Sequence, residues 1–247
     1  LQKDTTPKSY TFDVTTTDQV VSIGNGNYKK GSKISIEAQP IEDYVFDHWE
    51  LNGEEVSKAN PYDFTLSDET AGDYTAVYLA PTLDKLSFTL NDDGETYSVK
   101  ALNTDIEGAV VIPSTYEGKS VTTILDRGFL GCYNLKSATI PNSVIDIGKS
   151  AFASCDELVT VSISQKIETI NNSLFEDCSS LVNVTIPKNV TSIGVSAFYG
   201  CSSLLNITIP DSVTDIGISA FAYCNNVTEI TIGKGVINIG KEAFEEC

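Results

Sequence analysis

The chain has 247 residues, 41% of them hydrophobic, and its 34 acidic and 16 basic side chains give a formal net charge of −18. Length and apolar fraction are typical of one large folded domain or two smaller ones, while the acidic balance excludes a basic nucleic-acid-binding surface and disfavours anionic membranes. No apolar run approaches the roughly 18 residues of a membrane span, so membrane insertion is not expected.

The first element in chain order is a short tail over residues 1–8, in a chain that begins without methionine. Such a start is typical of a trimmed or mature N-terminus, and a secretion signal could have preceded it. A secretory origin therefore agrees with this end of the sequence.

Residues 9–81 are rich in Tyr, Asp and Thr and contain the strand-like stretches YTFDVTT, VVSI, KISIEAQP and YTAVYLA. Turn signals at GNGNYKKG and LNGEE separate them, which predicts a small β-rich domain. We expect the aromatic residues Tyr44, Phe46 and Trp49 in its core and His48 at its surface.

The spacings G-x-Y-x-x-G, A-x-P and Y-x-F-x-x-W-x-x-N-G in this region resemble the divergent internalin-type B-repeat. The positions that carry the resemblance are Gly26, Tyr28, Gly31, Ala38, Pro40, Tyr44, Phe46, Trp49, Asn52 and Gly53. The resemblance implies a β-grasp-like module that serves as a stalk or spacer in surface proteins.

Residues 82–111 are expected to form a β-hairpin, LSFTLNDDGETYSVKAL, with Asp93 and Gly94 in its turn. The stretch NDDGE lacks the alternating ligand spacing of a calcium loop, so a plain turn is the preferred interpretation. The hairpin precedes a repetitive region, whose first unit needs a cover for its apolar end. We therefore expect it to be the N-terminal cap of that region.

Residues 112–247 repeat with a period of 23 residues. The residues in step are Cys132, Cys155, Cys178, Cys201, Cys224 and Cys247, each preceded three residues earlier by Phe129, Phe152, Phe175, Phe198, Phe221 and Phe244. A fixed period of this length predicts a solenoid, here with five full units and one partial unit. Because the sixth unit stops halfway, the native protein is expected to continue.

Each unit contains the pattern L-x-x-(V/I)-x-I, whose alternation predicts a strand with one buried face. A second apolar pair follows and ends at Gly or Asn, and then comes A-F-x-x-C, which is too short for a regular helix and predicts a single helical turn. One unit cannot bury its apolar positions alone, whereas stacked coils form a continuous core. The expected fold class is therefore a mostly β solenoid with a parallel sheet, preceded by a small β-rich domain.

The six cysteines are expected to be free thiols buried in a ladder. Equivalent residues of neighbouring coils lie about 5 Å apart with parallel Cβ vectors, whereas a disulfide needs Cβ atoms within roughly 4.5 Å that face each other. The single histidine, His48, lies outside the repeats, and the sequence has no zinc-type cluster of Cys and His. Neither a metal site nor a cofactor is expected.

The pattern I-P-x-S-V-x-x-I-G-x-x-A-F-x-x-C-x-x-L resembles the BspA-like leucine-rich repeats of bacterial cell-surface proteins. The resemblance covers residues 112–247 and implies a right-handed leucine-rich-repeat solenoid with a parallel sheet on one face. Its members are mostly surface proteins associated with adhesion to host or matrix components. The unit from Ile163 departs from the pattern at Ser164, Asn171 and Leu174, so a local distortion is expected there.

Outward-facing polar residues alternate with the buried residues of each predicted strand and form a nearly uncharged stripe, called here the polar stripe. They are Ser137, Thr139, Thr160, Ser162, Asn183, Thr185, Asn206, Thr208, Glu229 and Thr231. One interpretation is that threonine simply suits an exposed strand. The other is that the stripe binds a protein or glycan partner, although it contains no aromatic residue, which weakens the glycan version.

The sequence contains no constellation of nucleophile, base or metal ligands, so no enzymatic activity is expected. The leading hypothesis is a monomeric, non-catalytic protein, secreted or on the cell surface, whose polar stripe recognises a host, matrix or cell-surface protein, glycoproteins included. The alternative hypothesis is a structural spacer or accessory region that displays another domain of a larger surface protein.

Overall fold

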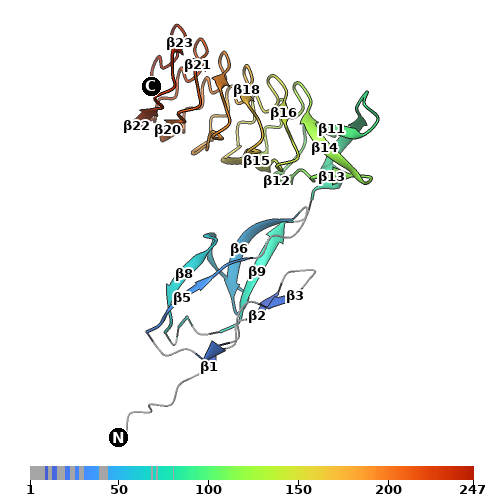
Figure 1. The fold of residues 1–247 in the computed structure, drawn as a ribbon, viewed down its shortest axis with the longest axis vertical. Helices are drawn as coiled ribbons and strands as arrows, with labels where there is room; N and C mark the ends of the chain where they lie inside the picture. Colours follow the sequence, from blue (N-terminus) through green and yellow to red (C-terminus); the bar gives the residue numbers. More distant parts are fainter. Residues whose placement is uncertain are drawn as a thin grey trace, which may run out of the picture. The chain divides into compact units, whose positions relative to one another are not determined.

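The computed structural model describes residues 9–10, 13–15, 20–22, 26–27, 31–38, 44–67, 69–70, 72–79 and 81–247. The chain divides into two compact units, Leu1–Ala80 and Pro81–Cys247 (Figure 1). The expected tail and the B-repeat positions Tyr28 and Pro40 lie outside the described residues.

The first unit consists of antiparallel strand pairs. The described strands are β1 (Ser9–Tyr10), β2 (Asp13–Thr15), β3 (Val20–Ser22), β4 (Gly26–Asn27), β5 (Lys33–Ile36), β6 (Val45–Leu51), β7 (Glu54–Ser57), β8 (Tyr62–Thr65) and β9 (Tyr74–Leu79). Strand β6 lies between β7 and β9, and β5 pairs with β8. Alternation in β9 buries every second residue, as expected for a strand with one face on a core.

Trp49 and Tyr74 are fully buried at the centre of this unit, and Tyr44 and Phe46 pack against them. The predicted core role of Tyr44, Phe46 and Trp49 is therefore confirmed. Burial also raises the pKa of the Tyr74 hydroxyl to about 12, because an apolar environment disfavours the phenolate.

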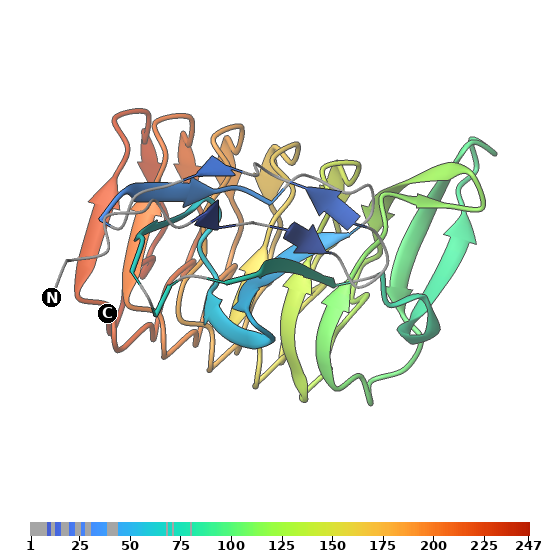
Figure 2. The same cartoon turned by 90° about the horizontal axis from the view of Figure 1, so that it is seen from below.

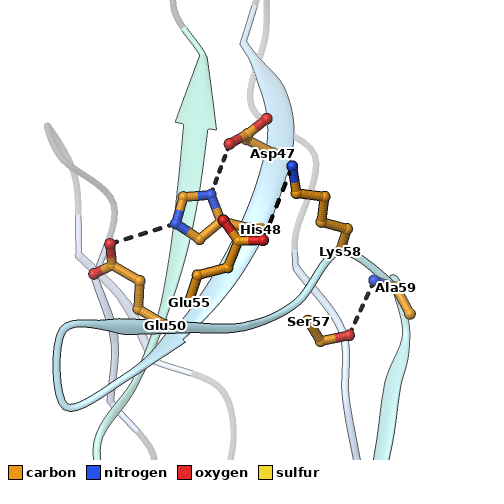
Figure 3. A network of polar contacts seen from close by, with 7 residues as sticks. All are labelled: Asp47, His48, Glu50, Glu55, Ser57, Lys58 and Ala59. Atoms are coloured by element: carbon orange, nitrogen blue, oxygen red, sulfur yellow. Dashed lines mark hydrogen bonds and ion pairs between the residues drawn. The ribbon is translucent and has the colours of Figure 1, made fainter. Parts of the chain in front are cut away.

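His48, expected at the surface, is half-buried, with 14% of its side chain exposed. Figure 3 shows the imidazole on β6 between two carboxylates, with Nδ1 2.6 Å from Asp47 Oδ2 and Nε2 3.4 Å from Glu50 Oε1. Hydrogen bonding to Asp47 raises the pKa of His48, because the neighbouring carboxylates favour the protonated ring. The adjoining hairpin places Lys58 Nζ 3.9 Å from Glu55 Oε1.

The second unit begins with a short 3₁₀-helix, η1 (Leu83–Lys85), and a hairpin of β10 (Leu86–Leu90) and β11 (Thr96–Ala101). Asp93 organises the turn, since its Oδ1 accepts the backbone N–H groups of Glu95 and Thr96 at 2.8 and 2.9 Å. Strand β11 pairs in parallel with β14 (Lys119–Ile124), which also pairs with β13 (Thr115–Tyr116). The hairpin thereby adds its own strands to the first coil and buries Val99 in the solenoid core.

Two rows of parallel strands follow along the solenoid (Figures 1 and 2). The first row contains β12 (Gly108–Val111), β15 (Leu135–Thr139), β17 (Thr160–Ser162), β20 (Asn206–Ile209) and β22 (Glu229–Ile232). The second row contains β16 (Asp146–Ile147), β18 (Thr169–Ile170), β19 (Ser192–Ile193), β21 (Asp215–Ile216) and β23 (Asn238–Ile239). The predicted mostly β, parallel solenoid is confirmed, and the second row adds strands at the predicted second apolar pair.

The A-F-x-x-C turns stack into a continuous apolar column. The phenylalanine rings lie nearly parallel, with centroid distances of 4.9, 5.7, 5.4, 5.0 and 5.4 Å from Phe129 to Phe244. Backbone hydrogen bonds link the same turns, as between the Phe198 N–H and the Ala220 carbonyl at 2.7 Å. Each coil therefore relies on both neighbours for its core and its backbone partners.

All six cysteines are free, as predicted, and five are buried while Cys247 is exposed. Interior thiols hydrogen-bond to backbone carbonyls of the preceding coil. Cys201 Sγ donates to the Phe175 carbonyl at 3.1 Å, and Cys224 Sγ donates to the Phe198 carbonyl at 3.3 Å. Burial raises the pKa of Cys201 well above that of an ordinary thiol, so the thiolate is strongly disfavoured.

The coil from Ile163 carries the expected distortion. Within the described strands, β18 pairs with β19 but not with β16, and residues 182–185 contribute a single bridge, from Asn183 to Thr160. A glycine fills the position equivalent to Asn171 in other coils, where a Cβ on Gly194 would lie 2.6 Å from a backbone nitrogen. Asn171 cannot approach so closely, and its Nδ2 instead donates to the Ile147 carbonyl at 2.7 Å.

Candidate functional site

The polar stripe lies on the first row of strands. Ser137 and Thr139 are half-buried, and the remaining members of the stripe are exposed. Strand β20 shows why these residues share a face: Ile207 and Ile209 point into the core and are 3% and 1% exposed, so Asn206 and Thr208, which alternate with them, point outward. The outward orientation predicted for the stripe thus follows from the strand geometry.

The register of the strands aligns the stripe into rows that cross the coils. Ser137 pairs with Thr160 and Thr139 with Ser162. Farther along the solenoid, Asn206 pairs with Glu229 and Thr208 with Thr231. Asn183 joins the first group through its bridge to Thr160, whereas Thr185 lies in the interruption between the two groups of paired strands.

Within the described part of the chain, the stripe side chains make no hydrogen bond or ion pair with other residues. Polar side chains at other repeat positions behave differently. The hydroxyls of Thr191, Thr214 and Thr228 each donate to a backbone carbonyl of the preceding coil at 3.2 Å. The stripe therefore holds donors and acceptors that the solenoid does not use for its own stability.

A groove of about 840 Å³ follows the stripe across the C-terminal coils. Its lining residues are Gln165, Asn183, Val184, Thr185, Ile186, Lys188, Asn206, Thr208, Ile209, Pro210, Asp211, Ser212, Thr231, Ile232, Gly233 and Lys234. Five stripe residues lie in it, from Asn183 to Thr231. The remaining stripe residues, Ser137, Thr139, Thr160, Ser162 and Glu229, do not line this groove.

Sequence reasoning missed the charged edge of the groove. Gln165, Lys188, Asp211 and Lys234 occupy one repeat position, three residues beyond the threonine position of the stripe. Two lysines at one repeat position of a chain with net charge −18 are the signal that could have identified this edge.

The described residues offer little for catalysis. Among them, no three His, Cys, Asp or Glu side chains gather in an arrangement that could hold a metal ion. The buried thiols have raised pKa values, as for Cys224 at about 12 because of burial, which is the opposite of what a nucleophile needs. In the same residues, no helix combines the length and apolarity required to cross a bilayer.

Comparison with known proteins identifies both parts of the chain. A family profile described as the BspA type leucine-rich repeat region matches residues 119–247 in six copies. A second profile, described as the divergent InlB B-repeat domain, matches residues 6–81. Both resemblances noted in the sequence are confirmed. A search of curated proteins gave no match.

Solved leucine-rich repeat structures share the fold. The T. pallidum leucine-rich repeat protein is 24% identical with a TM-score of 0.57, and the match covers 65% of this chain and 85% of that one. A Bacteroides ovatus leucine-rich repeat protein is 28% identical with a TM-score of 0.59, covering 66% of this chain and 44% of that one. A leucine-rich cell surface protein from Faecalibacterium prausnitzii is 33% identical with a TM-score of 0.55, covering 62% and 39%.

The match thus spans less than half the length of the latter two proteins. Leucine-rich repeat proteins are generally non-catalytic and mediate protein interactions, and both repeat types found here are typical of bacterial surface proteins. The profile match covers just over half of the sequence and coincides with the parallel coils of the second unit. The chain belongs to the BspA-type leucine-rich repeat family.

Proposed function

We propose that this chain is the binding region of an extracellular or cell-surface bacterial protein and that it recognises a host, matrix or cell-surface protein through the polar stripe. It acts without catalysis and as a monomer. The B-repeat unit serves as the stalk or spacer that presents the solenoid.

The observation that carries this proposal is the contrast between the stripe and the other polar positions of the solenoid. The stripe side chains have no partner within the described chain, whereas Thr191, Thr214 and Thr228 bond to the coil before them. A protein partner would satisfy such donors and acceptors across an interface, where about one hydrogen bond forms per 100–200 Å². The groove beside Thr185 and Thr208 adds the concave shape that a convex partner surface requires.

A structural spacer is the second candidate function. The B-repeat match and the stack of repeated coils favour it, since a solenoid needs no ligand to be stable. In that case the threonines are there because β-branched residues suit exposed strands. The two functions differ in a measurable way, because only a binding region loses an activity when its stripe is altered.

The test is a binding screen with the purified chain against immobilised matrix proteins and secreted glycoproteins. A stripe variant, Thr185→Arg/Asn206→Arg/Thr208→Arg, places bulky charges on the proposed surface. We expect a partner that binds the parent to lose at least thirtyfold in affinity, because a hot spot typically contributes 2 kcal/mol or more. These side chains are exposed, so the melting temperature should change little.

The matched control is Glu176→Arg/Asp177→Arg, which introduces similar side chains beside a cysteine turn and away from the stripe. Control and parent should bind equally. If the stripe variant binds like the parent while this control fails, the sheet face is not the binding site. If the parent binds nothing in the screen, the spacer function is preferred.

A further inference from the structure

We propose that the groove along the C-terminal coils binds an acidic peptide segment in extended conformation, with Lys188 and Lys234 contacting its carboxylates. This inference rests on the proposed function, because it assigns a ligand class to part of the polar stripe. The groove is lined by residues of successive coils, so its shape follows from stacking rather than from any single loop.

Two rows of side chains define the groove. Thr185, Thr208 and Thr231 form a row of hydroxyls, and Lys188, Asp211 and Lys234 lie three residues further along the same coils. The ring centroids of Phe175, Phe198 and Phe221 in these coils lie 5.4 and 5.0 Å apart, so each row runs across the coils at about that spacing. A ligand in the groove therefore lies across the strands, with hydroxyls on one side and charged side chains on the other.

The charge of this edge contrasts with the charge of the chain as a whole. The chain has a net charge of −18, yet two of the three charged residues that line the groove are lysines. In the described part of the chain neither lysine ammonium forms an ion pair or hydrogen bond. Asp211 lies between them, and its Oδ1 accepts the backbone N–H of Lys234 at 2.8 Å.

Apolar side chains between the rows favour a peptide over a glycan. Ile186 and Ile209 are buried beneath the groove, and Ile232 is 44% exposed within it. None of the lining residues, all of which the structure describes, is aromatic, so the stacking surface on which sugar rings are commonly held is missing. Apolar surface combined with two ammonium groups suits a segment that carries both apolar and acidic side chains.

An extended peptide has the dimensions that the groove requires. Successive side chains of a strand point to opposite sides, at a rise of about 3.3 Å per residue. From Gln165 to Lys234 the groove crosses three coil spacings, or about 16 Å, which a segment of about five residues covers. Alternation of apolar and acidic residues would place one set on the apolar surface around Ile232 and the other within reach of the flexible lysines.

The experiment uses a fluorescein-labelled peptide of eight residues in which glutamate and valine alternate. Its binding to the full chain is followed by fluorescence anisotropy at low and high salt. We expect Lys188→Gln/Lys234→Gln to weaken binding at least tenfold, and we expect salt to weaken binding to the parent. Peptides with lysine or glutamine in place of glutamate should bind at least tenfold more weakly.

The matched control is Lys100→Gln/Lys149→Gln, which removes the same charge from exposed positions outside the groove. It should bind the glutamate–valine peptide like the parent, and all variants should keep the parent melting temperature. Equal losses in the groove and control variants would overturn the proposal, because binding would then follow net charge alone. Stronger binding of heparin than of the peptide would also overturn it, in favour of an anionic glycan.

The two proposals fail in different ways. If the parent ignores the acidic peptide but binds a protein partner through the stripe, only the acidic ligand class is wrong. If the acidic peptide binds and depends on the lysines while the stripe variant keeps its protein partner, the groove is a separate site and the proposed function is wrong.

Discussion

The coil from Ile163 and the coil from Ile186 have the same length and the same buried Phe and Cys, yet they differ in their backbone pairing. Strand β19 of the regular coil pairs with β18 and β21 on both sides. Strand β18 of the irregular coil pairs only with β19. The apolar column runs through both, as the stacking of Phe175 on Phe198 at 5.4 Å shows.

This difference teaches that the solenoid depends more on its side-chain column than on its strand ladders. The cause is local: Gly194 allows its N–H to reach the Ile170 carbonyl at 2.7 Å, whereas Asn171 uses its side-chain amide for the equivalent carbonyl. Burial of large side chains contributes several kcal/mol each, and a single hydrogen bond contributes about 1 kcal/mol. A coil can therefore lose ladder pairing and remain in the stack.

The largest expected effect is on the column itself. Phe198 is fully buried between Phe175 and Phe221, so Phe198→Ala should lower the free energy of unfolding by about 3–5 kcal/mol. Phe244 is only half-buried and stacks on one ring, so Phe244→Ala should cost less than half as much. Urea denaturation followed by circular dichroism measures both. Equal losses would mean that the last coil is covered as well as the interior ones.

The next largest loss of stability is expected from a substitution that introduces the asparagine of the irregular coil into a regular coil. Gly217→Asn adds a Cβ that would lie 2.5 Å from the backbone of Gly194 and Val195. Such overpacking costs about 1–3 kcal/mol, and the variant should lose hydrogen-exchange protection at the N–H of residue 217, which bonds to the Ile193 carbonyl in the parent. Ile218→Asn is the control, because its side chain is 51% exposed. An unchanged free energy of unfolding for Gly217→Asn would refute the steric explanation.

The reverse substitution should have a smaller effect. Asn171→Gly removes the bond from Asn171 Nδ2 to the Ile147 carbonyl and allows a backbone bond in its place. Because the two bonds are of similar strength, the free energy of unfolding should change by no more than about 1 kcal/mol. Hydrogen exchange at residue 171 should become slower. Faster exchange there would argue that something other than Asn171 holds the two coils apart.

The last prediction concerns the accessibility of the thiols, which reports on the packing of the apolar column and needs no substitution. Five thiols are buried and Cys247 is exposed, and burial raises the pKa of Cys201 and Cys224. An aromatic disulfide reagent at pH 8 should therefore modify mainly Cys247 in the native protein and six thiols after denaturation. Rapid native modification of interior thiols would show that the column opens readily, and fewer than six thiols after denaturation would contradict the free ladder.

Much of the fold could be predicted because each coil repeats the same local rules. The strand at Asn206–Ile209 follows from alternation, and the position of Phe198 in the core follows from the period. The second row of strands was harder to predict from the sequence, because strands of two residues such as β19 contain no alternating pattern. The substitution at Asn171 marked where the solenoid would be irregular, but not which ladder would be lost.

The candidate site was predicted only in part. The outward face of Thr185 and Thr208 follows from the strand pattern, whereas the groove could not be inferred from one coil because several coils line it. Residues that line one groove but lie far apart in the sequence produce no local sequence pattern.

The sequence by itself determined the 23-residue coil, the buried column of Phe and Cys, the free thiols and the outward polar stripe. These features depend on residue type at a fixed period, and the period sets which side of the chain faces the core. Tertiary structure alone decided where the ladders break and where Lys188, Asp211 and Lys234 border a groove. Those features depend on contacts between stacked coils, such as the close approach of Gly194 to the backbone of Asn172 and the bond from the Asn171 side chain to the Ile147 carbonyl, which no single coil contains.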